Sequence, residues 1–142
     1  MIELKSGCIL LDKKFKFRDN EIGEKLIILL NNPNLRDNEP YLFCRTTSRE
    51  RPPYLIKTPK GCQKDSNYFF INECSFFPKD TWLLLNDIHE YDCTRMLKKH
   101  FDKEIKIIDC INEITLRQIK NCIKDSIDIS YKHLKMILDT IV

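Results

Sequence analysis

Glycine is scarce in this chain of 142 residues, which contains only three glycines, no two of them close in sequence. Loops that cradle a phosphate need closely spaced glycines, because glycine lets the backbone turn tightly and approach the phosphate. The sequence therefore excludes the Rossmann and P-loop classes of nucleotide-binding protein.

Long apolar runs are also missing. A helix that spans a membrane needs about 20 consecutive apolar residues, and no stretch of this sequence approaches that length. The first eleven residues do not have the pattern of a signal peptide. With 42% hydrophobic residues, 32% charged residues and a net charge of +3, the chain suits a folded cytoplasmic protein without a membrane partner. We expect a single domain over residues 1–142.

Closely spaced cysteines are a third absence. The seven cysteines cannot all pair within one chain, and their wide spacing matches neither a disulfide framework nor a Cys-x-x-Cys zinc site. We therefore expect reduced, partly buried thiols, and no metal or other cofactor. His89 lies among Asp87, Glu90 and Asp92, a pattern typical of a charged surface turn; a carboxylate pair for hydrolysis is the alternative interpretation.

Short strands are predicted over most of residues 1–111, and residues 18–25 and 31–40 are predicted loops. Runs of apolar, aromatic and β-branched residues, bounded by turn-forming residues, predict strands at 8–11, 25–31, 41–44, 68–72, 81–85 and 104–111, and an edge strand at 54–57. Met96, Leu97 and Phe101 indicate a short helix within residues 88–101.

Helical spacing replaces strand patterns in residues 112–142. Thr115 and Gln118 form a capping-box pattern, with Thr115 as the cap, and Ser130 is a candidate cap for a second helix. The apolar residues that follow Thr115 at helical spacing are Leu116, Ile119, Cys122 and Ile123. Many short strands followed by helices predict an α+β fold, a small barrel or rolled sheet with helices at one end.

Positive charge is concentrated in residues 45–64, where Glu50 is the single acidic residue. Clustered Lys and Arg side chains bind polyanions by releasing condensed counterions, so this stretch is a candidate RNA-binding surface; a solvated loop is the alternative. Thr47 and Ser48 lie at its start, where hydroxyls suit a phosphate site, although a strand end followed by a turn also explains them. The six basic residues are Arg45, Arg49, Arg51, Lys57, Lys60 and Lys64.

The order of short motifs resembles the MazF/PemK-type toxin family. Residues 5–12 resemble its opening strand, residues 23–29 its junction into the second strand, and residues 43–48 its third strand, which ends in a Thr-Ser pair. Thr81-Trp82, the strand at 103–110 and the closing helices follow in the family's order. Two positions depart from the pattern: Lys25-Leu26 replaces Arg-Pro, and Cys8 replaces an acidic residue.

This resemblance implies an SH3-like β-barrel with C-terminal helices, strand-rich over 1–111 and helical over 112–142. It implies a homodimeric endoribonuclease that cuts single-stranded RNA without a metal and is neutralised by an antitoxin protein. The catalytic positions it implies are Lys25, Thr47 and Ser48. The candidate RNA-binding residues are Arg18, Arg45, Arg49, Arg51 and Lys57. A catalytically inactive barrel that binds RNA or protein is the alternative, favoured by Lys25, because Lys lacks the two-pronged donor geometry of Arg.

Overall fold

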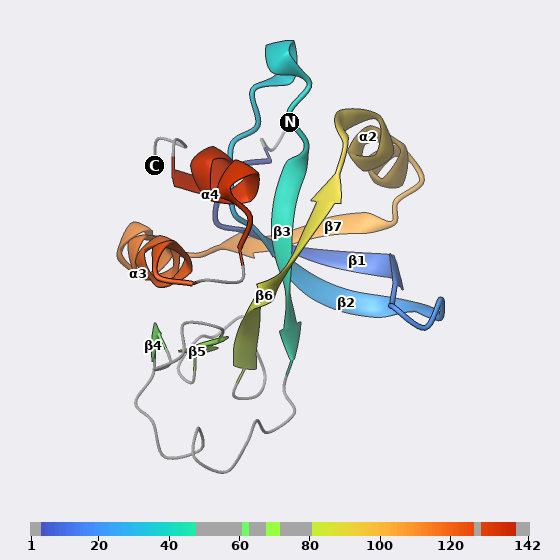
Figure 1. Cartoon of the computed structure of the whole chain (residues 1–142). Coiled ribbons are helices and arrows are strands. Elements are labelled where there is room, and N and C mark those ends of the chain that lie inside the picture. Colours follow the sequence, from blue (N-terminus) through green and yellow to red (C-terminus); the bar gives the residue numbers. More distant parts are fainter. Residues whose placement is uncertain (1–3, 48–60, 63–67, 72–80, 127–128, 139–142) are drawn as a thin grey trace.

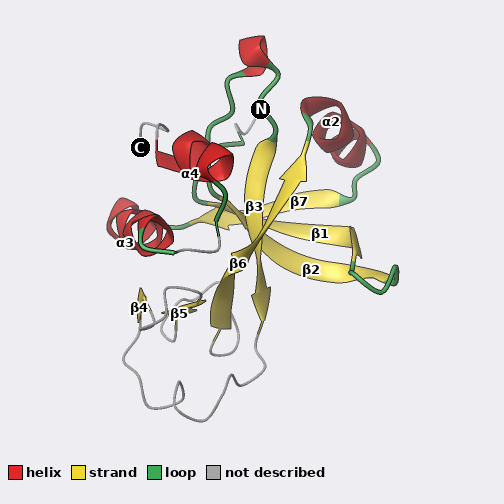
Figure 2. Ribbon diagram, in the orientation of Figure 1, coloured by secondary structure: helices red, strands yellow, loops and turns green. Residues whose placement is uncertain are grey.

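The computed structural model describes residues 4–47, 61–62, 68–71, 81–126 and 129–138 (Figures 1 and 2). The strands in these ranges are β1 (Cys8–Lys16), β2 (Ile22–Leu29), β3 (Tyr41–Thr47), β4 (Gly61–Cys62), β5 (Tyr68–Ile71), β6 (Thr81–Tyr91) and β7 (Ile105–Cys110). The helices are the 3-10 helix η1 (Leu35–Asp37) and the α-helices α2 (Cys93–Phe101), α3 (Glu113–Lys124) and α4 (Tyr131–Leu138).

The strands form one antiparallel sheet in the order β4-β5-β6-β3-β2-β1-β7. The three α-helices together with this sheet confirm the expected α+β class. Within the described residues the two outermost strands, β4 and β7, do not pair with each other, so the sheet is not closed.

The sheet is strongly coiled, so that β1 and β6 meet across one face although β2 and β3 separate them in the strand order. In a flat sheet, strands three places apart lie about 14 Å from each other. Here the rings of Phe15 on β1 and His89 on β6 have centroids only 5.3 Å apart. The hydroxyl of Tyr91 on β6 also donates a 2.6 Å hydrogen bond to Asp12 on β1. We call the face on which these side chains meet the concave face.

The two faces of the sheet bury separate apolar clusters, as alternation along the strands requires. Leu10, Ile27 and Phe43 lie in the cluster of the concave face, which Met96 of α2 joins. Ile9, Ile28, Leu42 and Cys44, each one residue away along the same strands, lie in the cluster of the opposite face with residues of α3 and α4. The opposite face, which we call the convex face, is therefore the one that α3 and α4 cover (Figure 1).

Helices α3 and α4 begin at side-chain caps. The predicted stripe of α3 is buried as expected, with Leu116, Ile119 and Ile123 at most 3% exposed. The predicted cap of α3 is wrong: Asn112 is the cap, and its side chain accepts from the backbone N–H of Thr115 at 2.8 Å. The cap of α4 is confirmed, since the Ser130 hydroxyl accepts from the backbone N–H of His133 at 3.2 Å.

A buried ionic cluster attaches α2 to the sheet. The Asp12 carboxylate is fully buried, and Lys99 Nζ of α2 donates to its two oxygens at 3.0 and 3.1 Å. Lys99 also donates to the carbonyl of Lys14 at 3.1 Å. Burial, followed by the hydrogen bond to Asp12, raises the pKa of Tyr91 far above its usual range, so its hydroxyl stays a proton donor. Each polar group in the cluster therefore has a partner, which a buried charge requires.

The expectation that all thiols are reduced is wrong for two of the seven cysteines. Cys62 of β4 and Cys122 of α3 form a disulfide across a sequence separation of 60 residues, with Cα atoms 5.5 Å apart. Cysteine spacing could not predict this pair, because the two residues are far apart in the sequence and meet only in the folded chain. Cys8, Cys44, Cys93 and Cys110 are thiols.

The predicted strands at 8–11, 25–31, 41–44, 68–72, 81–85 and 104–111 all correspond to observed strands, although several bounds differ. The largest difference is in β6, which continues through residues 86–91 instead of ending at 85. The pairs Cys44↔Ile88 and Thr46↔Leu83 show why: β6 uses five steps where β3 uses two, which defines a bulge. The edge strand predicted at 54–57 lies outside the described residues.

Candidate nucleic-acid interface

Four polar side chains meet where the turn between β1 and β2 approaches β6, and Asp87 of β6 is at their centre. Arg18, in that turn, donates from Nη2 to Asp87 Oδ1 at 2.6 Å. Arg45 of β3 donates from Nε to Asp87 Oδ2 at 2.9 Å. His89 of β6 has its Nε2 atom 3.1 Å from the same Oδ2, without hydrogen-bond geometry. We call these residues the Asp87 cluster.

The position of the cluster follows from strand register. Phe43 of β3 pairs with His89, and Cys44 pairs with Ile88; the bulge begins after this pair, and the 2.9 Å hydrogen bond shows that Arg45 reaches Asp87 there. Opposite residues in an antiparallel pair point to the same face. Phe43 belongs to the concave cluster, so Arg45, Asp87 and His89 all lie on the concave face. The coiling of the sheet then brings Arg18 to the same place from the other side.

Cations control the ionisation of Asp87. Burial alone would raise the pKa of this carboxyl, but the hydrogen bond from Arg18 and the electrostatic attraction of nearby His89 and Arg45 outweigh burial, so the pKa is lowered. The hydrogen bond to Asp87 in turn raises the pKa of Arg18. With one carboxylate and two guanidinium groups, the cluster carries net positive charge even when His89 is neutral. Such a surface attracts phosphates.

Two aromatic rings hold the imidazole of His89. The ring of Phe43 stacks on it with centroids 5.4 Å apart and an interplanar angle of 16°. The edge of Phe15 packs at 5.3 Å and 71°. Contacts on two sides restrict the ring to one orientation beside Asp87. A histidine held in this way next to a carboxylate has the geometry of a general base.

The predicted catalytic positions Lys25 and Thr47 lie on the neighbouring strands β2 and β3. Ile27 of β2 pairs with Arg45 of β3, and this is the last pair of the ladder before Lys25 and Thr47. The hydroxyl of Thr46 donates to the carbonyl of Leu26 at 2.9 Å, which shows that the two strands are still adjacent there. Arg45 and Thr47 are two residues apart on one strand and so share a face. Thr47 is buried and Lys25 is partly exposed.

Among the predicted RNA-binding residues, the structure brings Arg18 and Arg45 together although they are 27 positions apart in the sequence. The Arg18 side chain is 79% exposed, whereas Arg45 is 23% exposed, so Arg18 is the more accessible cation. The remaining predicted site residues, Ser48, Arg49, Arg51 and Lys57, lie outside the described residues.

Sequence reasoning missed Asp87 and His89 as site residues. The charged surface turn predicted around His89 is wrong, because Asp87, His89 and Glu90 belong to β6 and Asp92 caps α2. The available signal was the alternation of Asp87, His89 and Tyr91, which is typical of one face of a strand. The predicted strand instead ended at residue 85.

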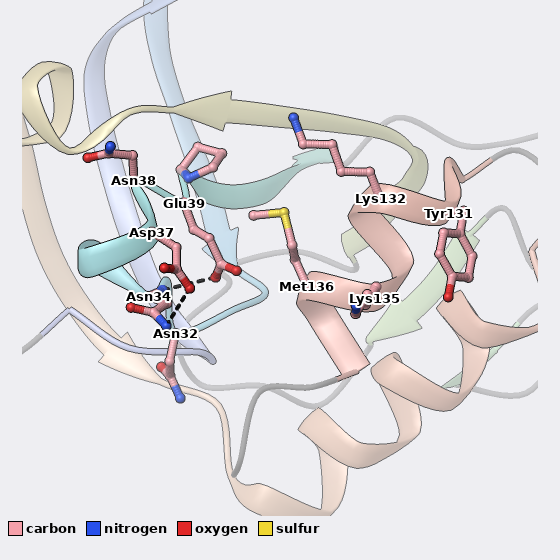
Figure 3. Close-up of a pocket in the computed structure, with 10 residues that line it drawn as sticks. Asn32, Asn34, Asp37, Asn38, Glu39, Tyr131, Lys132, Lys135 and Met136 are labelled. Carbon is pink, nitrogen blue, oxygen red and sulfur yellow. Dashed lines mark hydrogen bonds between the residues drawn. The ribbon is translucent and has the colours of Figure 1, made fainter.

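A cavity of about 710 Å³ lies elsewhere, between α4 and the loop that connects β2 to β3 (Figure 3). One wall carries Asp37 and Glu39, and the other carries Lys132 and Lys135. Asn34 already binds both acidic side chains, donating to Asp37 from its side chain and to Glu39 from its backbone, each at 2.9 Å. These hydrogen bonds account for the acidic wall without a ligand.

Comparisons with known proteins supply no family for the chain: no protein-family model and no curated protein matches it. In the described part of the chain, no three His, Cys, Asp or Glu side chains are grouped as a metal ion would require. None of the described helices has the length and apolar character to cross a membrane.

Proposed function

We propose that this chain is a metal-independent endoribonuclease of the MazF/PemK type that cuts single-stranded RNA in the cytoplasm, within a toxin–antitoxin or defence system. The motif order in the sequence supports the family, and the coiled antiparallel sheet suits an SH3-like barrel with C-terminal helices. A homodimer and an inhibitory antitoxin protein are part of the same proposal, and no cofactor is needed.

The observation that carries the proposal is the gathering of cations, a hydroxyl and a histidine on the concave face. Lys25 and Thr47 lie on adjacent strands, and Arg45, which belongs to the Asp87 cluster, is two residues from Thr47 on β3. Cleavage of RNA by its own 2′-hydroxyl needs a base for that hydroxyl, positive charge for the phosphorane and a donor to the leaving 5′-oxygen. These side chains include all three kinds of group.

Each group has a role in this scheme. Neutral His89 accepts the proton as the 2′-oxygen attacks phosphorus, and Asp87 stabilises the imidazolium that forms. Arg45 and Lys25 stabilise the phosphorane, and Lys25 donates to the 5′-oxygen as its bond to phosphorus breaks. Thr47 binds a phosphate oxygen together with Ser48. The products are a 2′,3′-cyclic phosphate and a free 5′-hydroxyl. The cations that bind flanking phosphates are Arg18, Arg49, Arg51 and Lys57.

RNA binding without cleavage is the second candidate function, and Asp87 is the observation that favours it. The Asp87 carboxylate accepts hydrogen bonds from both Arg18 and Arg45. A phosphate in the site would need the same two side chains. Lys25 stands at the position where the MazF/PemK-type family has Arg. An ammonium group cannot bind a phosphate with two parallel hydrogen bonds. In this alternative the chain regulates RNA or a partner protein.

The test is incubation of the purified protein with mixed-sequence single-stranded RNA in EDTA, followed by analysis of the product ends. Cleavage that leaves 2′,3′-cyclic phosphates supports the ribonuclease. Salt-sensitive binding without products supports the second candidate. If RNA is neither bound nor cut at low salt and stoichiometric protein, both candidates are wrong.

Variants then test the site. Lys25→Ala, Thr47→Ala and Arg45→Ala should each reduce cleavage at least tenfold, and Lys25→Arg should retain or increase it, because Arg restores two-pronged phosphate binding. Arg36→Ala is the matched control, since this exposed arginine lies in η1, outside the Asp87 cluster. Equal rates for Arg45→Ala and Arg36→Ala would contradict the site assignment.

A further inference from the structure

The disulfide between Cys62 and Cys122 joins two elements that differ greatly in how firmly the rest of the fold holds them. Cys122 lies in α3, a helix of 12 residues whose Ile119 and Ile123 are fully buried in the convex core. Cys62 lies in β4, which has two residues and pairs with two residues of β5. The disulfide is the covalent link between β4 and α3.

The disulfide borders a hollow in the surface of about 340 Å³. Both cysteines line this hollow, and the other lining residues are Gly61, Gln118, Asn121 and Asp125. Cys62 is exposed, whereas Cys122 is 2% exposed. The hollow has room for a small thiol, and the exposed Cys62 sulfur is the one that an attacking thiolate can reach.

The position of Cys122 also indicates that the reduced protein stays folded. Its neighbours in the convex core are apolar, and a buried thiol behaves as a small hydrophobic group. The contacts of Ile119 and Ile123 with that core do not depend on the disulfide. Reduction would therefore break the covalent link between β4 and α3 while α3 keeps its place on the sheet.

We propose that Cys62–Cys122 is a thiol–disulfide exchange site for a dithiol reductant, and that reduction detaches β4 from α3 without unfolding the domain. A thiolate of the dithiol attacks Cys62, the bond between the two protein sulfurs breaks, and Cys122 leaves as a thiolate that takes up a proton. The second thiol of the reductant attacks the mixed disulfide and releases Cys62. Two electrons pass to the protein, which gains two thiols, and the dithiol becomes a disulfide.

A dithiol suits this site better than a monothiol because of the geometry of the released cysteine. After the first step Cys122 is still next to Cys62, where its thiolate can attack the mixed disulfide and reverse the reaction. The second thiol of a dithiol competes within the same complex, at high effective concentration. A monothiol must compete by a second collision.

The other thiols in the described part of the chain provide internal references. The sulfur atoms of Cys8 and Cys110 are 3.3 Å apart, and burial raises the pKa of Cys110 to about 11. Burial raises the pKa of Cys44 to about 12. Thiols with such pKa values react slowly near neutral pH. Alkylation of the native protein should therefore distinguish Cys62 from Cys44 and Cys110.

The experiment is differential alkylation of the full chain after incubation with dithiothreitol, or with glutathione at equal thiol concentration. One iodoacetamide isotope is added to the native protein, a second after denaturation, and the labelled peptides are read by mass spectrometry. We expect dithiothreitol to give native-state label on Cys62 and late label on Cys122 and Cys44. Glutathione should leave mostly the disulfide or its adduct on Cys62. Complete reduction by glutathione at the same rate would overturn the choice of a dithiol.

Melting and near-UV circular dichroism decide whether the domain stays folded. Reduction should preserve the near-UV spectrum and lower the melting temperature by roughly 10 °C, because a long loop is no longer closed. Cys62→Ser should melt like the reduced protein and not respond to the dithiol, whereas the matched control Cys93→Ser should respond like the wild type. Loss of the near-UV spectrum on reduction, or reduction that occurs only as fast as global unfolding, would overturn the proposal. RNA cleavage is not needed for either measurement.

Discussion

Replacing Lys99 with alanine should cost far more stability than replacing its neighbour Lys98, although both are lysines of α2. Lys99 is 6% exposed and donates to the fully buried carboxylate of Asp12 and to the carbonyl of Lys14. Its removal leaves a buried charge without its cation, a change that costs about 3–5 kcal/mol. Because a domain is stable by only about 5–15 kcal/mol, Lys99→Ala should remove a large part of the free energy of unfolding.

Urea unfolding at pH 7, followed by circular dichroism, measures this cost. Lys98→Ala is the matched control, because Lys98 is exposed and such substitutions change stability by less than about 0.5 kcal/mol. The double variant Asp12→Asn with Lys99→Met removes both charges and keeps an acceptor for Tyr91, so it should recover much of the loss. If Lys99→Ala costs no more than Lys98→Ala, the ionic cluster does not hold α2 in solution. If the double variant costs the sum of the single ones, the two charges are not coupled.

Two further predictions concern acid stability and helix capping. The folded pKa of Asp87 lies below its unfolded value, so its ion pairs stabilise the fold above the unfolded pKa, and this contribution is lost as pH falls through the folded pKa. The Asp87→Asn variant should therefore lose less stability than the wild type between pH 5 and pH 2 in urea titrations. If both proteins lose the same free energy of unfolding over this pH range, the ion pairs of Asp87 do not stabilise the fold. Asn112→Ala should lower the unfolding free energy by about 1 kcal/mol because it removes the cap of α3. If Thr115→Ala lowers the unfolding free energy more than Asn112→Ala does, Thr115 is the cap of α3.

Most of the secondary structure could be predicted from local sequence, because its strands are short apolar runs between strong turn signals. Leu26 to Leu30 between charged and Asn-Pro segments is an example. The extent of β6 could not be predicted in this way. Leu83 and Leu85 belong to the convex core, while Tyr91 belongs to the concave one, so odd-numbered residues change face within a single strand. A bulge of this kind breaks the period on which pattern arguments depend.

The candidate site was only partly predictable for a related reason. Lys25 and Thr47 lie on strands that are neighbours in sequence and in the sheet, so a motif in each was enough to predict that their strands are adjacent. The meeting of Arg18 with Asp87 depends on the coiling of the sheet, which no short motif records. The burial of Lys99 and the Cys62–Cys122 bond are also products of tertiary structure, because each joins segments at least 60 positions apart.

After its bulge, β6 contributes side chains both to the Asp87 cluster and to the ionic cluster that attaches α2. Asp87 and His89 belong to the polar cluster, and Tyr91, two residues further, binds the carboxylate that holds α2. A shift of one residue in a strand moves each later side chain to the other face. Deleting one residue between Leu85 and Asp87 would therefore turn Asp87, His89 and Tyr91 to the convex face, towards α3 and α4. The Asp87 cluster and the attachment of α2 therefore depend on the same register of β6, so a deletion at this point of the strand would disrupt both.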